Sequence, residues 1–275
     1  MIKKNSIDLS IIVLLYRSEE TIKILLDSIR PATKKLTIQI ILVDNGFPDR
    51  AADIASKHPL NPTIIRLSQN VGFSRGVNLA LTEATGKNIL LLNADTRVLG
   101  SALVKLVTFA NNQLNLGAVV PRLISPDGSP QASIFHFPTI WGAIKFRFFN
   151  RGEAFGKYLP RAVLQTVDVA QMAAMLIPKK TFDQVGRLDE RFFFYYEDME
   201  FCKRLKDANL PIYYLPSAKI EHLHGASGKF VEHLHSPLVK SAQTYHGKAY
   251  YQILNLVLWI GHKWQVILRG HSFKD

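Results

Sequence analysis

Short, mainly apolar runs of residues recur along the first hundred positions of the chain. They cover residues 10–15, 38–43, 63–67 and 90–92 and are rich in β-branched and leucine side chains, as in strands buried on both faces of a sheet. Apolar residues at helical spacing follow the first strand, between residues 22 and 29. Strands that alternate with helices predict an open, doubly wound and mainly parallel α/β sheet with right-handed crossovers.

The second half of the chain predicts further elements with a less regular pattern. A helix should begin near Asp198, because Phe201, Cys202 and Leu205 form one apolar face. Pro216 lies inside an apolar run and predicts an edge strand or a bent one. The other expected elements are a helix at 103–109, a loop at 121–128, and strands at 117–120, 167–177 and 213–220.

Two aromatic and basic segments leave alternatives open. Residues 134–149 predict either a helix packed on the sheet or a mobile flap or interfacial surface for an amphipathic acceptor. Residues 250–264 predict helices that either pack on the core or rest on an anionic membrane. The apolar tail at 254–268 is interrupted by polar residues and falls short of the roughly 20 residues that a membrane-spanning helix needs.

Two of the predicted strands end at a carboxylate, Asp44 after the second strand and Asp95 after the fourth. Ligands of open α/β sheets bind beyond the carboxyl ends of the strands, so either side chain could hold a substrate or a cation. Asp95 precedes Thr96 and could equally be a turn or helix-capping residue.

A glycine-containing loop lies between these two carboxylates, with Gly72, Arg75 and Gly76 before a helix that we expect to begin at Val77. Backbone N–H groups at such a helix start can bind a phosphate, and Arg75 adds positive charge. Glycine turns open many helices, so the loop alone does not establish a phosphate site.

Two carboxylates, Glu197 and Asp198, follow the aromatic residues 192–196 at the start of a predicted helix. The helix dipole lowers the pKa of a carboxyl there, whereas desolvation by aromatic neighbours raises it. A general base for neutral pH requires desolvation to dominate. Asp198 could instead be a simple N-cap.

The net charge of the 275 residues is +12, which favours anionic partners such as nucleic acid, acidic lipid headgroups or phosphorylated small molecules. The basic residues are dispersed and no nucleic-acid-binding signature occurs, so we expect no nucleic acid partner. The lone cysteine, Cys202, excludes an internal disulfide and is expected to be a core thiol. Four histidines, His222, His224, His233 and His235, suggest zinc, but one histidine joining Asp95 on a divalent cation is the favoured interpretation.

Five sequence blocks occur in an order that matches a known family. The chain resembles the inverting GT-A glycosyltransferases of family 2, particularly the bacterial rhamnosyltransferase-like branch that builds cell-surface polysaccharides. The resemblance covers about residues 8–230. The blocks are Val43-Asp44-Asn45; Asn70-Val71-Gly72-Phe73 with Gly76 and Asn78; Leu92-Asn93-Ala94-Asp95; residues 186–193 running into Glu197-Asp198; and residues 216–222 with Gly225 and Ser227.

The resemblance implies a role for each matching position. Asp44 would pair with the nucleotide base, and Asp95 would hold Mg²⁺ or Mn²⁺ on the donor diphosphate with His222 beside it. Asp198 would be the general base. The other implied residues are Asn70, Gly72, Arg75, Asn78 and Asn93 for donor binding, with Asn93 at the weaker first position of a D-x-D-like triplet, and Glu197 and Asp189 in support. Arg17 and Phe47 depart from the family pattern near the expected base and ribose site, so the resemblance does not identify the donor nucleotide or its sugar.

The implied fold is GT-A, a Rossmann-like, mainly parallel central sheet flanked by helices, with a C-terminal helical extension. We expect a catalytic domain at 1–230, divided near 120 into a nucleotide-sugar half and an acceptor half, and the extension at 231–275. The implied function is transfer of a sugar, rhamnose among the candidates, from a dTDP-, UDP- or GDP-sugar to a saccharide or polyprenyl-linked acceptor. The expected location is the cytoplasm or the inner face of the cytoplasmic membrane. The alternatives are a nucleotidyltransferase and a non-catalytic basic protein that binds nucleic acid or acidic membrane.

Overall fold

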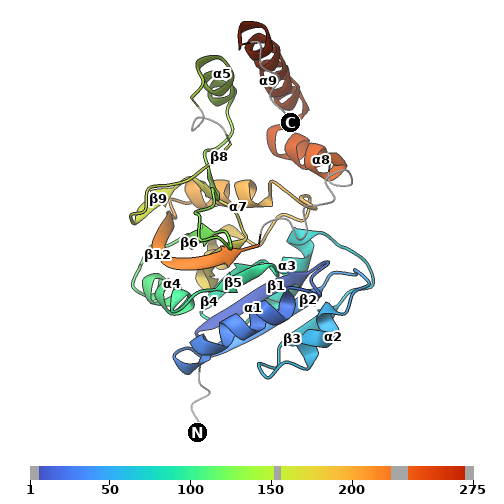
Figure 1. The fold of residues 1–275 in the computed structure, drawn as a ribbon, viewed down its shortest axis with the longest axis vertical. Helices are drawn as coiled ribbons and strands as arrows, with labels where there is room; N and C mark the ends of the chain where they lie inside the picture. The colour runs from blue at the N-terminus through green and yellow to red at the C-terminus, as the bar shows by residue number, and fades with distance from the viewer. Residues whose placement is uncertain (1–5, 152–155, 224–234, 270–275) are drawn as a thin grey trace.

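A computed structural model describes residues 6–151, 156–223 and 235–269, and Figure 1 shows its layers. The central sheet has the strand order β3-β2-β1-β4-β11-β6-β12-β5, and β9 pairs with β12 beside this path. The predicted α/β class is confirmed. The boundary expected between residues 230 and 231 falls outside the described residues.

The first half of the sheet is parallel throughout, and its elements are those that the apolar pattern predicts. Helix α3 begins at Phe73 rather than at Val77, because Gly72 already turns the chain at a φ of 84°. Pro31 lies in the 3-10 helix η1 that follows α1. The elements are β1 (Leu9–Leu15), α1 (Ile22–Ile29), η1 (Arg30–Lys34), β2 (Ile38–Asp44), α2 (Ala51–Ser56), β3 (Thr63–Arg66), α3 (Phe73–Glu83) and β4 (Asn88–Leu92).

The second half of the sheet is mixed, because β11 runs antiparallel between β4 and β6. The expected loop from Pro121 is wrong at its start: parallel pairing of Arg122–Ile124 with β12 extends β6 past the proline. Strand β12 has neighbours on both sides and is bent, with a register shift that contains Pro216. The elements are β5 (Thr96–Val98), α4 (Ala102–Asn111), β6 (Ala118–Ile124), β9 (Gln165–Val167), β11 (Ala174–Pro178), α6 (Lys179–Val185), α7 (Glu197–Asp207) and β12 (Ile212–His222).

Both faces of the central sheet are buried. Along β1, Leu9, Ile11 and Val13 belong to one apolar cluster, which includes side chains of α1 and α4. Ile12 faces the opposite cluster, which includes side chains of α3 and α7. Successive side chains of a strand point to opposite faces, so a run that is apolar at nearly every position is explained by helices on both sides.

A small sheet and three helices lie beyond the central sheet. The small sheet has the order β10-β7-β8, and α5 and α9 pack side by side away from the central sheet (Figure 1). Helix α5 of this basic aromatic segment therefore does not lie on the central sheet, and the mobile flap or interfacial surface stays a prediction. No helix of the described residues is long and apolar enough to cross a membrane. These elements are β7 (Ile134–Phe135), α5 (Ile140–Phe149), β8 (Lys157–Tyr158), β10 (Val169–Ala170), α8 (His235–His246) and α9 (Lys248–Arg269).

Candidate active site

A hollow of about 160 Å³ lies beyond the carboxyl ends of β1, β2 and β4. It brings together four residues that the sequence singled out: Asn70, Gly72, Asn93 and Asp95. They come from two separate loops, and the parallel strands before them place both loops at one edge of the sheet. The remaining lining residues are Leu14, Tyr16, Ser18, Asn45, Phe73, Ala94, Phe193 and Phe194.

Asp95 and His222 meet at this edge although 127 positions separate them in the chain. Both are buried, and His222 Nε2 lies 3.3 Å from Asp95 Oδ1. Strand β12 pairs antiparallel with β5, which begins directly after Asp95, and this pairing delivers the histidine. Asn93 Nδ2 lies 3.5 Å from the same imidazole nitrogen. The structure thus joins the two residues expected at the cation, and a proton or a cation between them would satisfy both.

Gln131 determines the orientation of the His222 ring. Its Nε2 donates to the backbone carbonyl of His222 at 2.8 Å, so its Oε1 faces His222 Nδ1 at 3.1 Å. An amide oxygen can only accept, and Nδ1 therefore carries the proton in this arrangement. In the neutral ring the lone pair is then on Nε2, on the side of Asp95, as a metal-binding histidine requires.

The donor set fits a cation that binds together with a substrate. Within the described residues, no group of three or more His, Cys, Asp or Glu side chains could hold a metal ion. A carboxylate and an imidazole fit Mn²⁺ or Mg²⁺ when substrate phosphates and water complete the coordination. The zinc interpretation depends on His224 and His233, which lie outside the described residues.

Asp44 lies at the end of β2 beside the hollow rather than in its lining. Arg66 Nη1 is 3.5 Å from its carboxylate. Partial burial raises the pKa of Asp44, and the charge of Arg66 opposes this. The Phe47 ring lies 5.0 Å from that of Tyr16, and the Arg17 guanidinium lies 4.8 Å from the centre of the Phe47 ring. Arg17 and Phe47, the two residues that depart from the family pattern, therefore contact each other, and the Phe47 ring packs at an angle on that of Tyr16.

The loop before α3 is held by side-chain amides. Asn70 Oδ1 accepts from Asn45 Nδ2 at 3.0 Å and from the Gly72 N–H at 2.9 Å. The Phe73 N–H donates to the Phe193 carbonyl at 2.7 Å. A Cβ atom at Gly72 would lie 2.5 Å from that same carbonyl oxygen, so only glycine permits this approach. The loop and the Phe193 segment thus form two walls of one hollow.

Three other residues expected at the site lie in different surroundings. Arg75 is exposed on α3, and Asn78 is buried. The Asn78 amide donates to the Leu188 carbonyl and to Glu190 and accepts from the Leu188 N–H, so it fixes the 188–190 turn to α3. Asp189 forms an ion pair with Arg191, and this hydrogen bond lowers its pKa. Donor binding by Arg75 and Asn78 stays a prediction.

The acidic pair stands where α7 begins. Tyr195 and Tyr196 both have left-handed backbones, at φ 67° and 68°, and turn the chain from the Phe193–Phe194 wall into Glu197. Met199 N–H donates to Asp198 Oδ1 at 2.8 Å. Glu197 is buried, and its Oε2 has no hydrogen-bond partner among the residues that the structure describes.

Desolvation dominates the ionisation of this pair. It raises the pKa of Glu197 to about 8, with a further increase from the charge of Asp198. It raises the pKa of Asp198 to about 6, against the Met199 N–H bond and the charge of Lys157. Burial therefore favours one proton on the pair near neutral pH, held more tightly by Glu197 than by Asp198. A carboxylate with a pKa close to 6 is suited to accept a proton at neutral pH.

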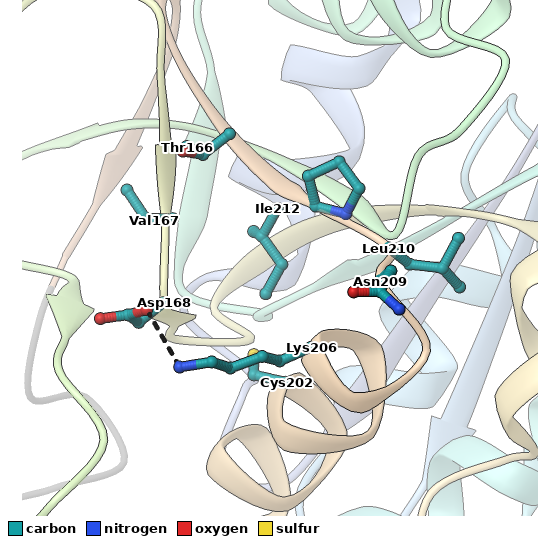
Figure 2. Close-up of a pocket in the computed structure, with 9 residues that line it drawn as sticks. Thr166, Val167, Asp168, Cys202, Lys206, Asn209, Leu210 and Ile212 are labelled. Atoms are coloured by element: carbon teal, nitrogen blue, oxygen red, sulfur yellow. Dashed lines mark ion pairs between the residues drawn. The ribbon is translucent and has the colours of Figure 1, made fainter.

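A second hollow, of about 270 Å³, lies between α7 and β12 and contains none of the expected donor, metal or base residues (Figure 2). Lys206 reaches across it to Asp168, at 3.8 Å. Cys202 lies at its floor, and burial raises the pKa of the thiol. The sulfur is thus a core atom, as expected, and not a nucleophile.

Several site residues had escaped the sequence-based interpretation. Asn45 and Phe193 lie inside the blocks quoted above and could have been selected as neighbours of Asp44 and Arg191. Gln131 could not, because a loop residue gives no signal of contact with a histidine 91 positions away. Sequence reasoning likewise had no signal for Lys157, whose charge lowers the pKa of Asp198.

The comparison with known proteins agrees with these features. The family model "Glycosyl transferase family 2" matches residues 10–171, more than half of the chain. This chain belongs to glycosyl transferase family 2. The predicted family resemblance is confirmed.

Relatives of this family 2 protein act in glycan assembly. The chain is 31% identical over 210 residues to the low-salt glycan biosynthesis hexosyltransferase Agl10 of Haloferax volcanii, which covers 74% of this chain and 64% of that protein. It is 25% identical over 232 residues to the N-acetylglucosaminyl-diphospho-decaprenol L-rhamnosyltransferase of Mycobacterium tuberculosis, covering 78% of this chain and 75% of that one. The chain therefore spans less than two thirds of the length of the first relative.

A solved structure supports the fold of this family 2 protein. GalNAc-T7 with UDP, GalNAc and Mn²⁺ superposes with a TM-score of 0.67 at 13% identity, over 90% of this chain and 49% of that one. The GT-A fold expected from the sequence is confirmed.

Proposed function

We propose that this family 2 protein is an inverting glycosyltransferase that moves a sugar from a nucleoside-diphosphate donor to a hydroxyl group of a saccharide or polyprenyl-linked acceptor. The observation that carries the proposal is the meeting of Asp95 and His222 at 3.3 Å beside a hollow at the strand ends. The wall of that hollow, Phe193–Phe194, leads within three residues to the acidic pair. Asp95 lines the hollow and Asp198 does not, so a shared role of the two residues is proposed from the short chain connection through Phe194.

Asp198 is the base in this proposal. Its carboxylate takes the proton of the acceptor hydroxyl while the hydroxyl oxygen forms a bond to the anomeric carbon. The bond from that carbon to the diphosphate oxygen breaks on the opposite face, and its electron pair leaves with the nucleoside diphosphate, which inverts the configuration. Because burial raises the pKa of Glu197 to about 8, this neighbour of Asp198 is expected to add no second negative charge to the acidic pair.

Asp95 and His222 would hold Mg²⁺ or Mn²⁺ together with oxygens of the donor diphosphate. When bound, the cation supplies stabilisation of the negative charge that grows on the leaving diphosphate. The His222 tautomer set by Gln131 supports this role, as does the Mn²⁺ named for GalNAc-T7. Asn93 contributes an amide rather than a second carboxylate, so this chain's own contribution to the cation is small.

The donor is proposed to be a dTDP-, UDP- or GDP-sugar, and rhamnose is the first candidate because the Mycobacterium relative is a rhamnosyltransferase. That relative's name also includes a diphospho-decaprenol, which supports a polyprenyl-linked acceptor. Asp44 would hold the nucleotide base, together with the Tyr16 and Phe47 rings. We propose a catalytic domain at 1–230, with halves meeting near 120, and an extension at 231–275. We also propose that the protein acts in the cytoplasm, at the inner face of the cytoplasmic membrane.

A donor-hydrolysis and transfer screen tests the proposal. Release of nucleoside diphosphate is measured for dTDP-rhamnose, UDP- and GDP-sugars with Mn²⁺, with and without EDTA. Asp198→Asn should lower turnover about 10²- to 10⁴-fold while donor binding persists. Asp207→Asn is the matched control, an exposed residue at the other end of α7. Near-full activity of Asp198→Asn would contradict the assignment, and release of pyrophosphate from a nucleoside triphosphate and a sugar phosphate would favour a nucleotidyltransferase.

A further inference from the structure

Helices α5 and α9 form a two-helix arm at one end of the molecule (Figure 1). They run side by side in the same direction: the Ile140 N–H donates to Tyr250 Oη at 3.1 Å, and Gln265 Nε2 donates to the Arg147 carbonyl at 2.7 Å. Gly261 permits the close approach, because a Cβ there would overlap the Cβ of Arg147. The arm is therefore a packed unit rather than two independent helices.

One face of α9 is apolar and exposed although the helix is already packed on α5. Ile253, Leu256, Ile260 and Trp264 are all exposed and follow one another at intervals of three, four and four residues. Such spacing aligns them on one side of a helix. Leu254 and Gly261 are buried on the neighbouring side, and Trp264 lies at the border, with its ring 6.3 Å from that of Phe148 in α5.

The apolar face continues onto α5. A hollow of about 370 Å³ between the two helices is lined entirely by apolar residues, Ile144, Phe148, Phe149, Val257 and Ile260. Phe149 and Ile260 are themselves exposed and connect the hollow with the open surface. An apolar surface that spans two helices in this way marks an interaction site.

All three tryptophans of the chain are in the arm. Trp141 and Trp259 are both 60% exposed. Lys145 Nζ lies 5.6 Å from the Trp141 ring, and Lys263 Nζ lies 5.9 Å from the Trp259 ring. Exposed indole rings flanked by lysines are the composition of helices that lie in the headgroup region of a bilayer.

The charge of the arm has one sign. Helices α5 and α9 contain no Asp or Glu, and neither does α8, which precedes α9 and forms the root of the arm. The whole chain, in contrast, has 22 acidic residues against 34 Lys and Arg. A surface without acidic groups complements anionic lipid headgroups. The six basic residues of these helices are Lys145, Arg147, Lys240, Lys248, Lys263 and Arg269.

We propose that the α5–α9 arm docks on the surface of an anionic phospholipid bilayer, with its apolar face among the upper acyl chains and its lysines at the phosphates. This names the surface and the lipid charge for the membrane location proposed above, but it is derived from the arm alone. The root of the arm contacts the active site: Ser241 Oγ of α8 donates to the Phe194 carbonyl at 3.0 Å. Docking would thus hold the acceptor side of the hollow next to the membrane.

Vesicle flotation of the full chain tests the proposal. The wild-type protein should float with vesicles of phosphatidylcholine and phosphatidylglycerol in equal parts, and at least about tenfold less with phosphatidylcholine alone. Ile253→Ser, Leu256→Ser and Trp264→Ser combined should lower partitioning about tenfold or more. The matched control combines Leu114→Ser, Val163→Ser and Leu164→Ser, three exposed apolar residues of the catalytic body.

A charge variant separates lipid binding from other causes. Lys145→Glu with Lys263→Glu should lower partitioning to anionic vesicles about tenfold, and Lys34→Glu with Lys35→Glu, exposed on the body, should not. Circular dichroism confirms that each variant folds. No flotation of the wild type, equal flotation of the triple arm variant, or an oligomer abolished by that variant would each overturn the proposal. Flotation needs no donor, so an active protein that fails to float contradicts docking alone, and a floating protein without transfer contradicts the reaction alone.

Discussion

At the scale of single residues, the proton on Glu197 determines how the acidic pair can work. Two adjacent carboxylates in a desolvated place cannot both ionise cheaply, and the buried Glu197 keeps its proton to a higher pH than Asp198. Asp198 can therefore carry the charge that a base needs. The division of roles follows from burial, since the two residues are neighbours in the sequence.

A first prediction concerns the pH dependence of stability. Because the pKa of Glu197 is raised in the folded protein, its contribution to stability is full below the unfolded pKa near 4.5 and is lost as the pH rises through about 8. Glu197→Gln removes this titration. The difference in unfolding free energy, variant minus wild type, should therefore be about 1–3 kcal/mol larger at pH 8 than at pH 5. Urea unfolding across this range measures it.

The control for that experiment is Glu83→Gln, an exposed residue at the end of α3. Its unfolding free energy should stay within about 0.5 kcal/mol of the wild type, as is usual for surface substitutions. A Glu197→Gln curve parallel to the wild type would mean that Glu197 ionises as an ordinary carboxyl.

A second prediction at this scale concerns Gln131, a positioning residue that acts through His222. Gln131→Leu removes the acceptor for the Nδ1 proton and releases the ring orientation. Outer partners of metal ligands typically contribute 10- to 100-fold in metal affinity, so the apparent Kd for Mn²⁺ in the presence of nucleoside diphosphate should rise by that factor. Titration calorimetry measures it, with Gln113→Leu at the end of α4 as control. An unchanged Kd would remove Gln131 from the site.

At the scale of elements, the shape of the hollow depends on a contact between two loops, one from each half of the sheet. The loop after β3 and the segment before α7 meet where Gly72 faces the carbonyl of Phe193. The Asn78 amide fixes the same two regions a turn further along α3. The shape of the hollow is therefore set by loop packing, and the strands only bring the loops to one edge.

Gly72→Ala should disturb this contact. Gly72 and Gly128 have nearly equal φ angles, 84° and 83°, but a Cβ at Gly128 would meet nothing within 4 Å. Both alanine variants incur a backbone cost of about 1–2 kcal/mol. Only Gly72→Ala should also weaken donor binding, by about tenfold or more, in a thermal-shift titration with nucleoside diphosphate. Equal donor affinities for the two variants would show that the loop contact does not shape the site.

At the scale of the whole molecule, the catalytic body and the arm have different compositions and different tasks. The body buries both faces of its sheet, whereas the arm leaves an apolar face uncovered and has no acidic residue in its helices. The root of the arm joins them through the ring of Tyr196, which lies 5.4 Å from that of Tyr245 in α8. Membrane contact and transfer are therefore expected to be separable by mutation.

The triple arm variant at Ile253, Leu256 and Trp264 should show this separation. With a lipid-linked acceptor in anionic vesicles, its rate should fall about tenfold or more, because docking raises the local concentration of enzyme at the acceptor. With a water-soluble acceptor fragment, its kcat/KM should equal that of the wild type. A loss of activity on both acceptors would indicate damage to the active site instead.

The sequence predicted the parts of the molecule that depend on local pattern. Mainly apolar runs identified β1, β2 and β4, because helices on both faces leave few polar positions in them. The strand-end rule then selected Asp95. Contacts across long chain separations gave no such pattern, as with Gln131 and His222 or Asn78 and Leu188. The pairing of α5 with α9 also escaped, since each helix was compatible with the core or a membrane.

Tyr196 belongs to both the acidic helix start and the aromatic stack at the root of the arm, where His246 lies over Tyr250 with their ring planes 10° apart. If docking orders this stack, thermodynamic linkage requires reciprocity: the factor by which docking strengthens acceptor binding is the factor by which acceptor binding strengthens docking. The protein would then dwell longer on membranes that carry its acceptor than on bare ones, and its distribution in the cell would follow the supply of acceptor.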